Sequence, residues 1–310
     1  MNKIANRQVI CDTLMEIAKT DKNIMVVACD SRGSASMTNF ANEYPELFVE
    51  VGIAEQDAVG IAAGLATCGK KPYVVSPASF LSMRSAEQVK VDVAYSNTNV
   101  KLIGISGGVS YGALGMTHHS LQDIAVMRAI PGLNVILPAD RIETKKMIET
   151  LNNYEGPVYI RIGRNAVSDV YENEDFNFEI GKANLMCNGN DITIIATGET
   201  VKPALDASKR LKEEGIGCRV INMHTLKPLD KDIIIKAANE TKGIITIEEH
   251  SIFNGLGAAV AEVVCQENPV KMKILGIKDE APITGTSKEV FNYYGLTEEN
   301  LVNEAKKIIG

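Results

Sequence analysis

A continuous apolar run at 24–29, followed by alternating helix and strand signals, constrains the fold of this chain more than any other feature. A strand that is apolar at every position is typical of a parallel sheet, because helices cover both of its faces. Further strands are predicted at 73–76 and 100–105, and helices at 4–19 and 82–95. This alternation predicts a doubly wound α/β domain. The other strands expected in this half lie at 47–51, 134–137 and 157–161.

An acidic, strand-poor stretch after residue 170 divides the chain. We place a linker at 173–182, between domains at 1–172 and 183–310. The predicted fold is α/β, with two doubly wound domains: a mostly parallel sheet is followed by a smaller, mixed sheet. The second domain repeats the alternation, with strands near 192–197, 218–222, 243–248 and 272–276.

The composition argues against several kinds of partner and location. The 310 residues carry a net charge of -7 with both signs scattered, which argues against nucleic acid or an anionic membrane as the main partner. No apolar run approaches the roughly 20 residues that a membrane helix needs. The polar N-terminus resembles no signal peptide. The six cysteines are widely spaced without a C-x-x-C pair, so we expect reduced thiols, no metal site and a cytoplasmic location.

Glu55 opens a stretch of very small residues that ends at Gly69. Gly60 and Gly64 lie inside the predicted helix, where each glycine costs roughly 1 kcal/mol relative to alanine. A chain tolerates this cost where another backbone or a ligand approaches closely. One carboxylate at the entrance to a small, apolar helix is a candidate for proton chemistry. The simpler interpretation is a solvated first-turn glutamate that favours the helix dipole.

A glycine-rich loop at 106–119 follows a predicted strand and ends in His118 and His119. Imidazole is the side chain best suited to move protons near neutral pH. The alternative is that one of the two histidines only packs on the next helix. Ser120 is the predicted cap of that helix, and Asp140 of the one after it.

Three arginines, one phenylalanine and a further histidine complete the candidates. Arg7, Arg161 and Arg164 are residues that bind an anionic group through forked hydrogen bonds, and Arg161 directly follows a strand. A solvated surface position is the simpler interpretation for Arg164. Phe80 is either a core residue or an aromatic face on which a flat heterocycle stacks. His250 is predicted to open a helix, with a structural or interfacial role.

These residues occur in segments that resemble the transketolase family of thiamine-diphosphate enzymes. Gly52–Gln56 resembles the glutamate segment of the pyrimidine-binding domain, and Pro77–Leu81 resembles the aromatic segment that stacks on the aminopyrimidine ring. Gly115–Pro131 resembles the segment of the active-site histidine. The resemblance covers nearly the whole chain and makes 1–172 the pyrimidine-binding domain and 183–310 the C-terminal domain. The second domain carries it at Leu226–Asp230, Ile244–Glu249, Ile283–Thr286 and Tyr294–Thr297.

The resemblance implies a transferase that moves a two-carbon ketol unit from a ketose (phosphate) to an aldose (phosphate) through thiamine diphosphate. Glu55 would hydrogen-bond the pyrimidine ring and assist loss of the thiazolium proton, and Phe80 would stack on that ring. His118 would assist proton transfer at the substrate. The other implied contacts are Ile53 and Asp30 with the cofactor, and Arg7, Ser34, His119 and Arg161 with the substrate.

Three departures from the family pattern concern the substrate and the assembly. Leu114 stands where the family places an acidic residue, and Ser106 stands where it places a histidine that faces the substrate phosphate. A sulfonated or otherwise non-standard sugar is therefore an alternative substrate. The half that binds diphosphate and magnesium is missing. The resemblance thus implies an N-terminal partner subunit that holds Mg²⁺ (or Ca²⁺) in an α2β2 heterotetramer, with the small face of the Glu55 helix as the symmetric contact.

Three rival interpretations stay open. The β subunit of a 2-oxoacid dehydrogenase has the same two-domain layout, but the segments 117–119 and 286–297 favour transketolase. A fragment of a deoxyxylulose-phosphate synthase is disfavoured because that enzyme is normally one chain. A non-catalytic regulatory or scaffold subunit is disfavoured by the joint presence of Glu55, Phe80 and His118.

Overall fold

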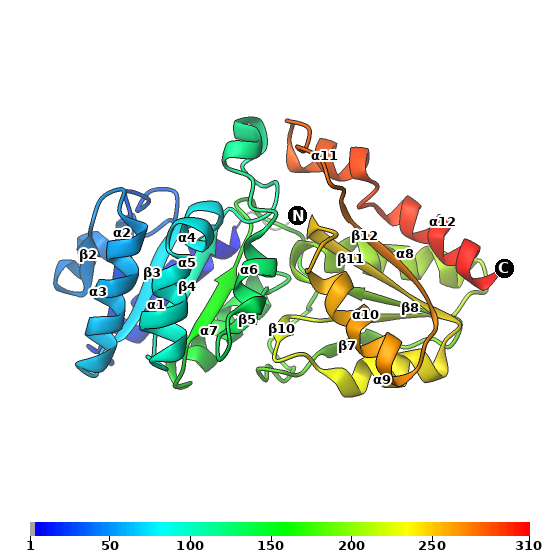
Figure 1. Ribbon diagram of the computed structural model, residues 1–310, viewed down its shortest axis with the longest axis horizontal. Coiled ribbons are helices and arrows are strands. Elements are labelled where there is room, and N and C mark those ends of the chain that lie inside the picture. The colour runs from blue at the N-terminus through cyan, green and yellow to red at the C-terminus, as the bar shows by residue number, and fades with distance from the viewer. Residues whose placement is uncertain (1–3) are drawn as a thin grey trace.

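The computed structural model describes residues 4–310 as two α/β lobes that lie side by side (Figure 1). Residues 1–3 of the first predicted domain lie outside this described part. The first lobe contains a seven-stranded sheet in the order β10-β5-β6-β4-β3-β1-β2, parallel throughout except where β10 meets β5. Its first six strands are β1 (Ile24–Ala28), β2 (Phe48–Glu50), β3 (Lys71–Pro77), β4 (Lys101–Ile105), β5 (Asn134–Ile136) and β6 (Val158–Arg161).

Helices connect these strands, and α3 and α7 contain the features predicted for them. Glu55 is the first residue of α3, and the Asp140 side chain caps α7 by accepting hydrogen bonds from the N–H groups of Ile142 and Glu143. The helices are α1 (Asn6–Ala18), α2 (Thr38–Glu43), η1 (Pro45–Leu47), α3 (Glu55–Thr67), α4 (Ala78–Arg84), α5 (Ala86–Gln88), η2 (Val89–Tyr95), η3 (Gly112–Thr117), α6 (Asp123–Ala129) and α7 (Arg141–Asn152).

The second lobe contains a five-stranded sheet in the order β12-β11-β8-β9-β7, in which only the β7–β9 pair is antiparallel. Its strands are β7 (Asn184–Cys187), β8 (Ile192–Ala196), β9 (Cys218–Asn222), β11 (Gly243–Ser251) and β12 (Lys271–Ile277). Its helices are η4 (Gly198–Thr200), α8 (Val201–Glu213), α9 (Lys231–Glu240), α10 (Leu256–Glu267), α11 (Ser287–Tyr294) and α12 (Glu298–Ile309).

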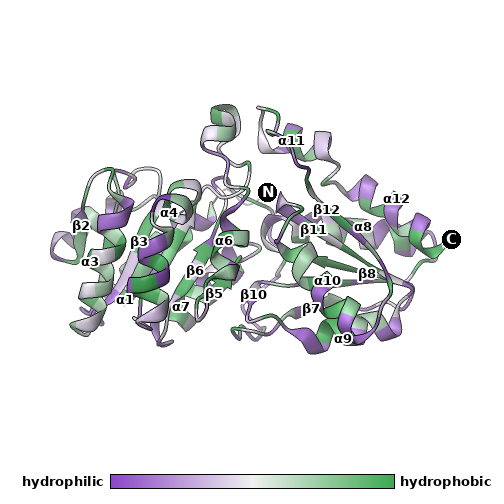
Figure 2. Cartoon of the chain, viewed as in Figure 1, coloured by the Kyte–Doolittle hydropathy of each residue, from purple (hydrophilic) through white to green (hydrophobic). Residues whose placement is uncertain are grey.

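Hydrophobic residues, green in Figure 2, are concentrated on the central strands of both sheets. Every residue of β1, β4, β8 and β9 is buried. Burial on both faces of these strands explains why their sequences show no alternation between apolar and polar positions.

The two lobes share a sheet and a buried hydrogen-bond network. Strand β10 (Thr225–Lys227) follows β9 in the chain but pairs with β5 of the first lobe. Glu143 is completely buried at this seam and accepts hydrogen bonds from Ala139 N–H, Asn222 and Tyr171. Burial raises the pKa of Glu143 to about 7. The lobes are therefore one packed unit, and the segment around the predicted linker packs into the seam.

Three local predictions differ from the structure. The helix expected at 82–95 starts earlier, at Ala78, and continues as the separate elements α4, α5 and the π-helix η2. Ser120 does not cap α6, which begins after Gln122 without a side-chain cap. His250 opens no helix: it is completely buried in β11, which continues to Ser251, three residues beyond the predicted end of this strand at 248.

Candidate active site

The candidate residues of the first lobe gather at the carboxyl edge of its parallel sheet. The connection after β1 runs to β2 on one side, whereas the connection after the neighbouring β3 runs to β4 on the other side, and this creates a switch point between β1 and β3 at this edge. Ligands of open α/β sheets bind at such points. Glu55 follows β2, Phe80 follows β3 and His118 follows β4. The topology therefore brings residues from distant parts of the sequence to one edge.

A row of charged and aromatic side chains runs along this edge. The Arg84 guanidinium lies 3.9 Å from the centre of the Phe80 ring. The Phe80 ring meets His118 edge to face, with centroids 5.2 Å apart, and His118 meets Tyr111 in the same way at 5.2 Å. The Arg164 guanidinium lies 5.0 Å from the centre of the Tyr111 ring. We call this set the Glu55–Arg7 row; it consists of Glu55, Arg84, Phe80, His118, Tyr111, Arg164 and Arg7.

Glu55 begins the row from a buried position at the start of α3. Its side chain is 3% exposed, and both of its carboxylate oxygens accept hydrogen bonds from Arg84 Nη1, at 2.9 and 3.0 Å. The buried Ser76 hydroxyl lies 3.4 Å from the same carboxylate. Burial and the nearby Glu55 raise the pKa of the Cys29 thiol to about 12. Glu55 is therefore a paired, buried carboxylate. The simpler interpretation, a solvated first-turn glutamate, does not hold.

Arg7 ends the row beside a second arginine. Its Nε donates to the backbone carbonyl of Arg164 at 2.9 Å, and its Nη1 donates to the carbonyl of Ser34 at 2.6 Å. Burial and the neighbouring Arg164 lower the pKa of Arg7. Within residues 4–310, the buried Nη1 atom of Arg164 and both amide atoms of Asn6 have no hydrogen-bond partner. This end of the row has positive charge and unused donors, which suits an anionic group.

The two histidines of the glycine-rich loop have different surroundings. His118 is half-buried, and its Nδ1 is hydrogen-bonded to the Thr117 hydroxyl at 2.9 Å. His119 is 2% exposed, and its Nε2 lies 3.1 Å from the Gly112 carbonyl. Burial lowers the pKa of His119 despite this hydrogen bond. The loop thus presents His118 to the row and places His119 inside the fold.

Arg161 lies apart from the row, in a buried cluster at the seam between the lobes. Its guanidinium is 6% exposed, donates to the Glu249 carbonyl at 2.7 Å, and lies 3.4 Å from Asp123 and 3.6 Å from the Glu249 carboxylate. Burial raises the pKa values of Glu249 and Glu199, and Arg161 opposes both shifts. Gly107 leaves room for Arg161, because a side chain there would collide with it. The structure thus surrounds Arg161 with carboxylates.

The other predicted contacts lie at the edges of the site. Ile53 is 73% exposed, and Asp30 is exposed with a left-handed backbone. Ser34 is half-buried and contributes its carbonyl, through Arg7. Ser106 is fully buried, and its hydroxyl has no hydrogen-bond partner among the described residues. Leu114 is 52% exposed on the loop before His118.

An open hollow of about 850 Å³ lies beside Glu55 and is also lined by Ile53, Gly60, Arg84 and Gln88. A methyl group added to Gly60 would meet no described atom within 4 Å, and the same holds at Gly64. The two helical glycines therefore leave free space next to the buried carboxylate.

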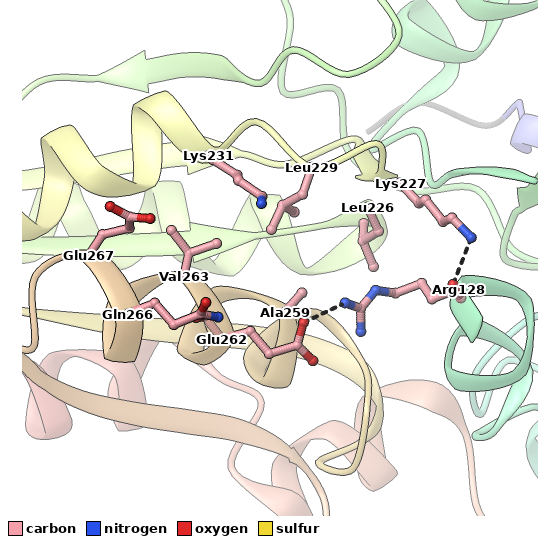
Figure 3. A pocket seen from close by; sticks show the side chains of 10 residues that line it. All are labelled: Arg128, Leu226, Lys227, Leu229, Lys231, Ala259, Glu262, Val263, Gln266 and Glu267. Carbon is pink, nitrogen blue, oxygen red and sulfur yellow. Dashed lines mark hydrogen bonds and ion pairs between the residues drawn. The ribbon is translucent and has the colours of Figure 1, made fainter. Parts of the chain in front are cut away.

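Figure 3 shows a second pocket, of about 280 Å³, at the seam between the lobes. Its two innermost cations are already bound by the chain: Arg128 donates to the Gly255 carbonyl at 2.9 Å, and Lys227 donates to the Arg128 carbonyl at 2.9 Å. None of the predicted site residues lines it. Residues 4–310 contain no group of three or more His, Cys, Asp or Glu that could hold a metal ion. Nor is any helix in this range long and apolar enough to cross a membrane.

Sequence reasoning missed Arg84 and Tyr111 and gave Arg164 the simpler surface interpretation. Arg84 lies four residues after Phe80, a spacing at which helical side chains meet. That signal was available in the sequence. Tyr111 and Arg164 have no comparable local signal, because loop and strand-end geometry decides where they point.

Two family models match the chain: the transketolase pyrimidine binding domain over residues 2–169, and the transketolase C-terminal domain over residues 181–301. The chain therefore belongs to the transketolase family. An apulose-4-phosphate transketolase subunit from Phocaeicola vulgatus is 55% identical over 308 residues, which are 99% of this chain and 98% of the relative.

Two further comparisons agree with this assignment. A 6-deoxy-6-sulfo-D-fructose transketolase subunit from a Clostridium species is 36% identical over 97% of this chain and 94% of the relative. A solved structure of a split-gene transketolase, an inactive β4 tetramer, matches with a TM-score of 0.91 at 36% identity, covering 99% of this chain and 98% of that one. The predicted fold class and the prediction of a C-terminal subunit of a two-chain transketolase are confirmed.

Proposed function

We propose that the Glu55–Arg7 row is this subunit's half of a site for thiamine diphosphate and a phosphorylated sugar. One observation carries the proposal: the flat Arg84 guanidinium stacks on Phe80 while it hydrogen-bonds Glu55. An aminopyrimidine ring needs the same two partners, an aromatic face and a carboxylate next to a ring nitrogen. The place of the guanidinium therefore supports a fit for such a ring between Phe80 and Glu55.

In this proposal Glu55 accepts a hydrogen bond from the pyrimidine ring and Phe80 stacks on it, with Ile53 and Asp30 at the margin. When bound, thiamine diphosphate supplies a nucleophilic carbon and an electron sink for the two-carbon unit. The C2–C3 bond of the donor ketose breaks, and a new carbon–carbon bond forms at the aldehyde carbon of the acceptor. His118, between Phe80 and Tyr111, moves the proton of the substrate hydroxyl whose oxygen becomes a carbonyl.

The anionic tail of the sugar lies at the Arg7 end. Arg7 and Arg164 supply positive charge, Ser34 orients Arg7, and His119 supports the loop from inside. Arg164 takes the place that the sequence prediction gave to Arg161, because Arg161 is enclosed by Asp123 and Glu249. We assign a phosphate tail, since the 55% identical relative is named for a phosphorylated ketose.

The proposal includes a partner chain. An N-terminal, diphosphate-binding subunit holds Mg²⁺ (or Ca²⁺) and completes the site in an α2β2 heterotetramer. We assign the symmetric contact of this assembly to the small face of α3. The assignment is supported by the free space beside Gly60 and Gly64 and by the strong exposure of Ile53 and Met83. We place the enzyme in the cytoplasm, where its six free cysteines would remain reduced.

The test is turnover of the chain mixed with its diphosphate-binding partner, thiamine diphosphate, Mg²⁺ and a ketose phosphate. Glu55→Ala should lower the turnover number by about 10²- to 10⁴-fold, because proton transfer at the cofactor depends on this carboxylate. Glu46→Ala, an exposed glutamate before β2, is the matched control and should leave turnover unchanged. Equal turnover of Glu55→Ala and wild type would refute the proposal.

A sulfonated sugar is the second candidate substrate, favoured by the 36% identical relative named for a sulfo-fructose and by Ser106 and Leu114. A panel of phosphorylated and sulfonated ketoses decides between them. A higher kcat/KM for the sulfonated sugars would replace the phosphate assignment and leave the cofactor site as proposed.

A further inference from the structure

Arg84 is the one member of the row that ends a helix and also faces open space. It is the last residue of α4, and its side chain is 44% exposed even though its partner Glu55 is 3% exposed. It lines the 850 Å³ hollow together with Gln88 and Gly60. A long side chain in this position is able to leave its partners, because 44% of it is exposed.

The contacts of Arg84 fall on the surfaces that the proposed function assigns to the cofactor ring. Its guanidinium stacks 3.9 Å from the Phe80 ring centre, and its Nη1 binds both oxygens of Glu55. Beyond Arg84, the only other hydrogen-bond partner of the Glu55 carboxylate among the described residues is Ser76, at 3.4 Å. A pyrimidine ring stacked on this face of Phe80 and bonded to Glu55 would occupy the place of the guanidinium, so the two exclude each other.

We propose that Arg84 is an internal latch on the cofactor site. In the cofactor-free subunit it occupies the place of the aminopyrimidine, and its partly exposed side chain swings out of that place when the cofactor loads. This inference rests on the proposed function and adds a residue that competes with the cofactor. The latch also stabilises the cofactor-free subunit. Without Arg84, Glu55 would be a buried carboxylate without a charged partner, which is strongly destabilising.

Chemistry explains why an arginine suits this place. The guanidinium is flat, stacks on aromatic rings and pairs with carboxylates, as the aminopyrimidine must. A lysine ammonium pairs with a carboxylate but does not stack as a plane. The latch weakens cofactor binding, because only subunits with an open latch bind. The apparent dissociation constant is the intrinsic one divided by the fraction of subunits in which the latch is open.

The test is calorimetric titration of thiamine diphosphate and Mg²⁺ into the assembled complex with the diphosphate-binding partner. Arg84→Gln should tighten cofactor binding by about tenfold, because the competitor is gone. Arg84→Lys keeps the charge beside Glu55 and should tighten binding less. Arg210→Gln is the matched control: Arg210 is 46% exposed and pairs with Glu298 in the second lobe. It should leave the dissociation constant unchanged.

Loading kinetics give a second readout. The loading rate of the wild type should level off at high cofactor concentration, at the rate of latch opening, whereas the rate of Arg84→Gln should keep rising. Unchanged or weaker cofactor binding by both Arg84 variants would overturn the latch and leave the site intact, provided that Glu55→Ala lowers turnover as proposed above. If the Arg84→Gln chain fails to assemble with its partner, the dissociation constant of the Arg84→Lys complex decides the test alone. Wild-type complex that binds no cofactor would overturn the proposed function and the latch together.

Discussion

Arg84 and Arg161 are both arginines paired with buried carboxylates, and the structure gives them opposite surroundings. Arg84 is 44% exposed, faces one carboxylate and borders an open hollow. Arg161 is 6% exposed and lies between Asp123 and Glu249, with the Glu249 carbonyl as a further acceptor. Exposure and the number of partners thus separate Arg84, for which we propose a movement, from Arg161, which its partners hold on several sides.

The same contrast holds for the two regions as wholes. The Glu55–Arg7 row has unused donors at Arg164 and Asn6 and free space next to Glu55. The seam is held by buried hydrogen bonds, such as those of Asn222 and Tyr171 to Glu143, although Arg161 Nε and Asn222 Oδ1 have no hydrogen-bond partner among the described residues. Mutations in the row should therefore change binding and turnover, and mutations in the seam should change stability.

The largest expected effect is in the row. His118→Ala should lower turnover of the assembled enzyme by about 10²- to 10⁴-fold while the calorimetric affinity for thiamine diphosphate stays close to that of the wild type, because His118 acts on the substrate proton. Met116→Ala, on the same loop and 46% exposed, is the control. A His118→Ala variant with wild-type turnover would remove this histidine from the proposed mechanism.

A smaller effect, of a different kind, is expected in the seam. Arg161→Met should lower the free energy of unfolding by about 3–5 kcal/mol, because it leaves Asp123 and Glu249 as buried charges without their cation. Denaturant unfolding measures this change. Arg141→Met is the comparison, since Arg141 and its partner Asp169 are 38% and 28% exposed, and it should cost under about 1 kcal/mol. Similar losses of unfolding free energy in the two variants would contradict the special stabilising role of the buried Arg161 cluster.

The smallest effect concerns pH. Burial raises the pKa of Glu143 to about 7, above its value in the unfolded chain. The folded state therefore binds a proton that the unfolded state releases, so the stability from this group is full at acidic pH and is lost as pH rises through about 7. Denaturation curves between pH 5 and pH 8 should show this fall. Glu143→Gln should flatten it, whereas Glu174→Gln, an exposed residue, should not.

Much of the fold followed from short stretches of sequence. The apolar run at 24–29 lies in and around β1, and Asp140 caps α7 as predicted. Glu55, Phe80 and His118 were chosen from local patterns, and the structure brings all three to one edge of the sheet. These features are local, because propensity, capping and burial act over a few residues. The pairing of β10 with β5 could not be predicted in this way, since it joins strands far apart in the chain.

The arginines mark the limit of sequence reasoning. The sequence alone determined that this chain forms two α/β domains of the transketolase type, with a carboxylate at the start of a small-residue helix. Only the tertiary structure decided that Arg161 faces the seam and that Arg164 faces the row. The reason is physical: a strand buried on both faces has no alternating pattern that shows where its last side chains point. Their partners, moreover, come from helix α6, the glycine-rich loop and the second lobe.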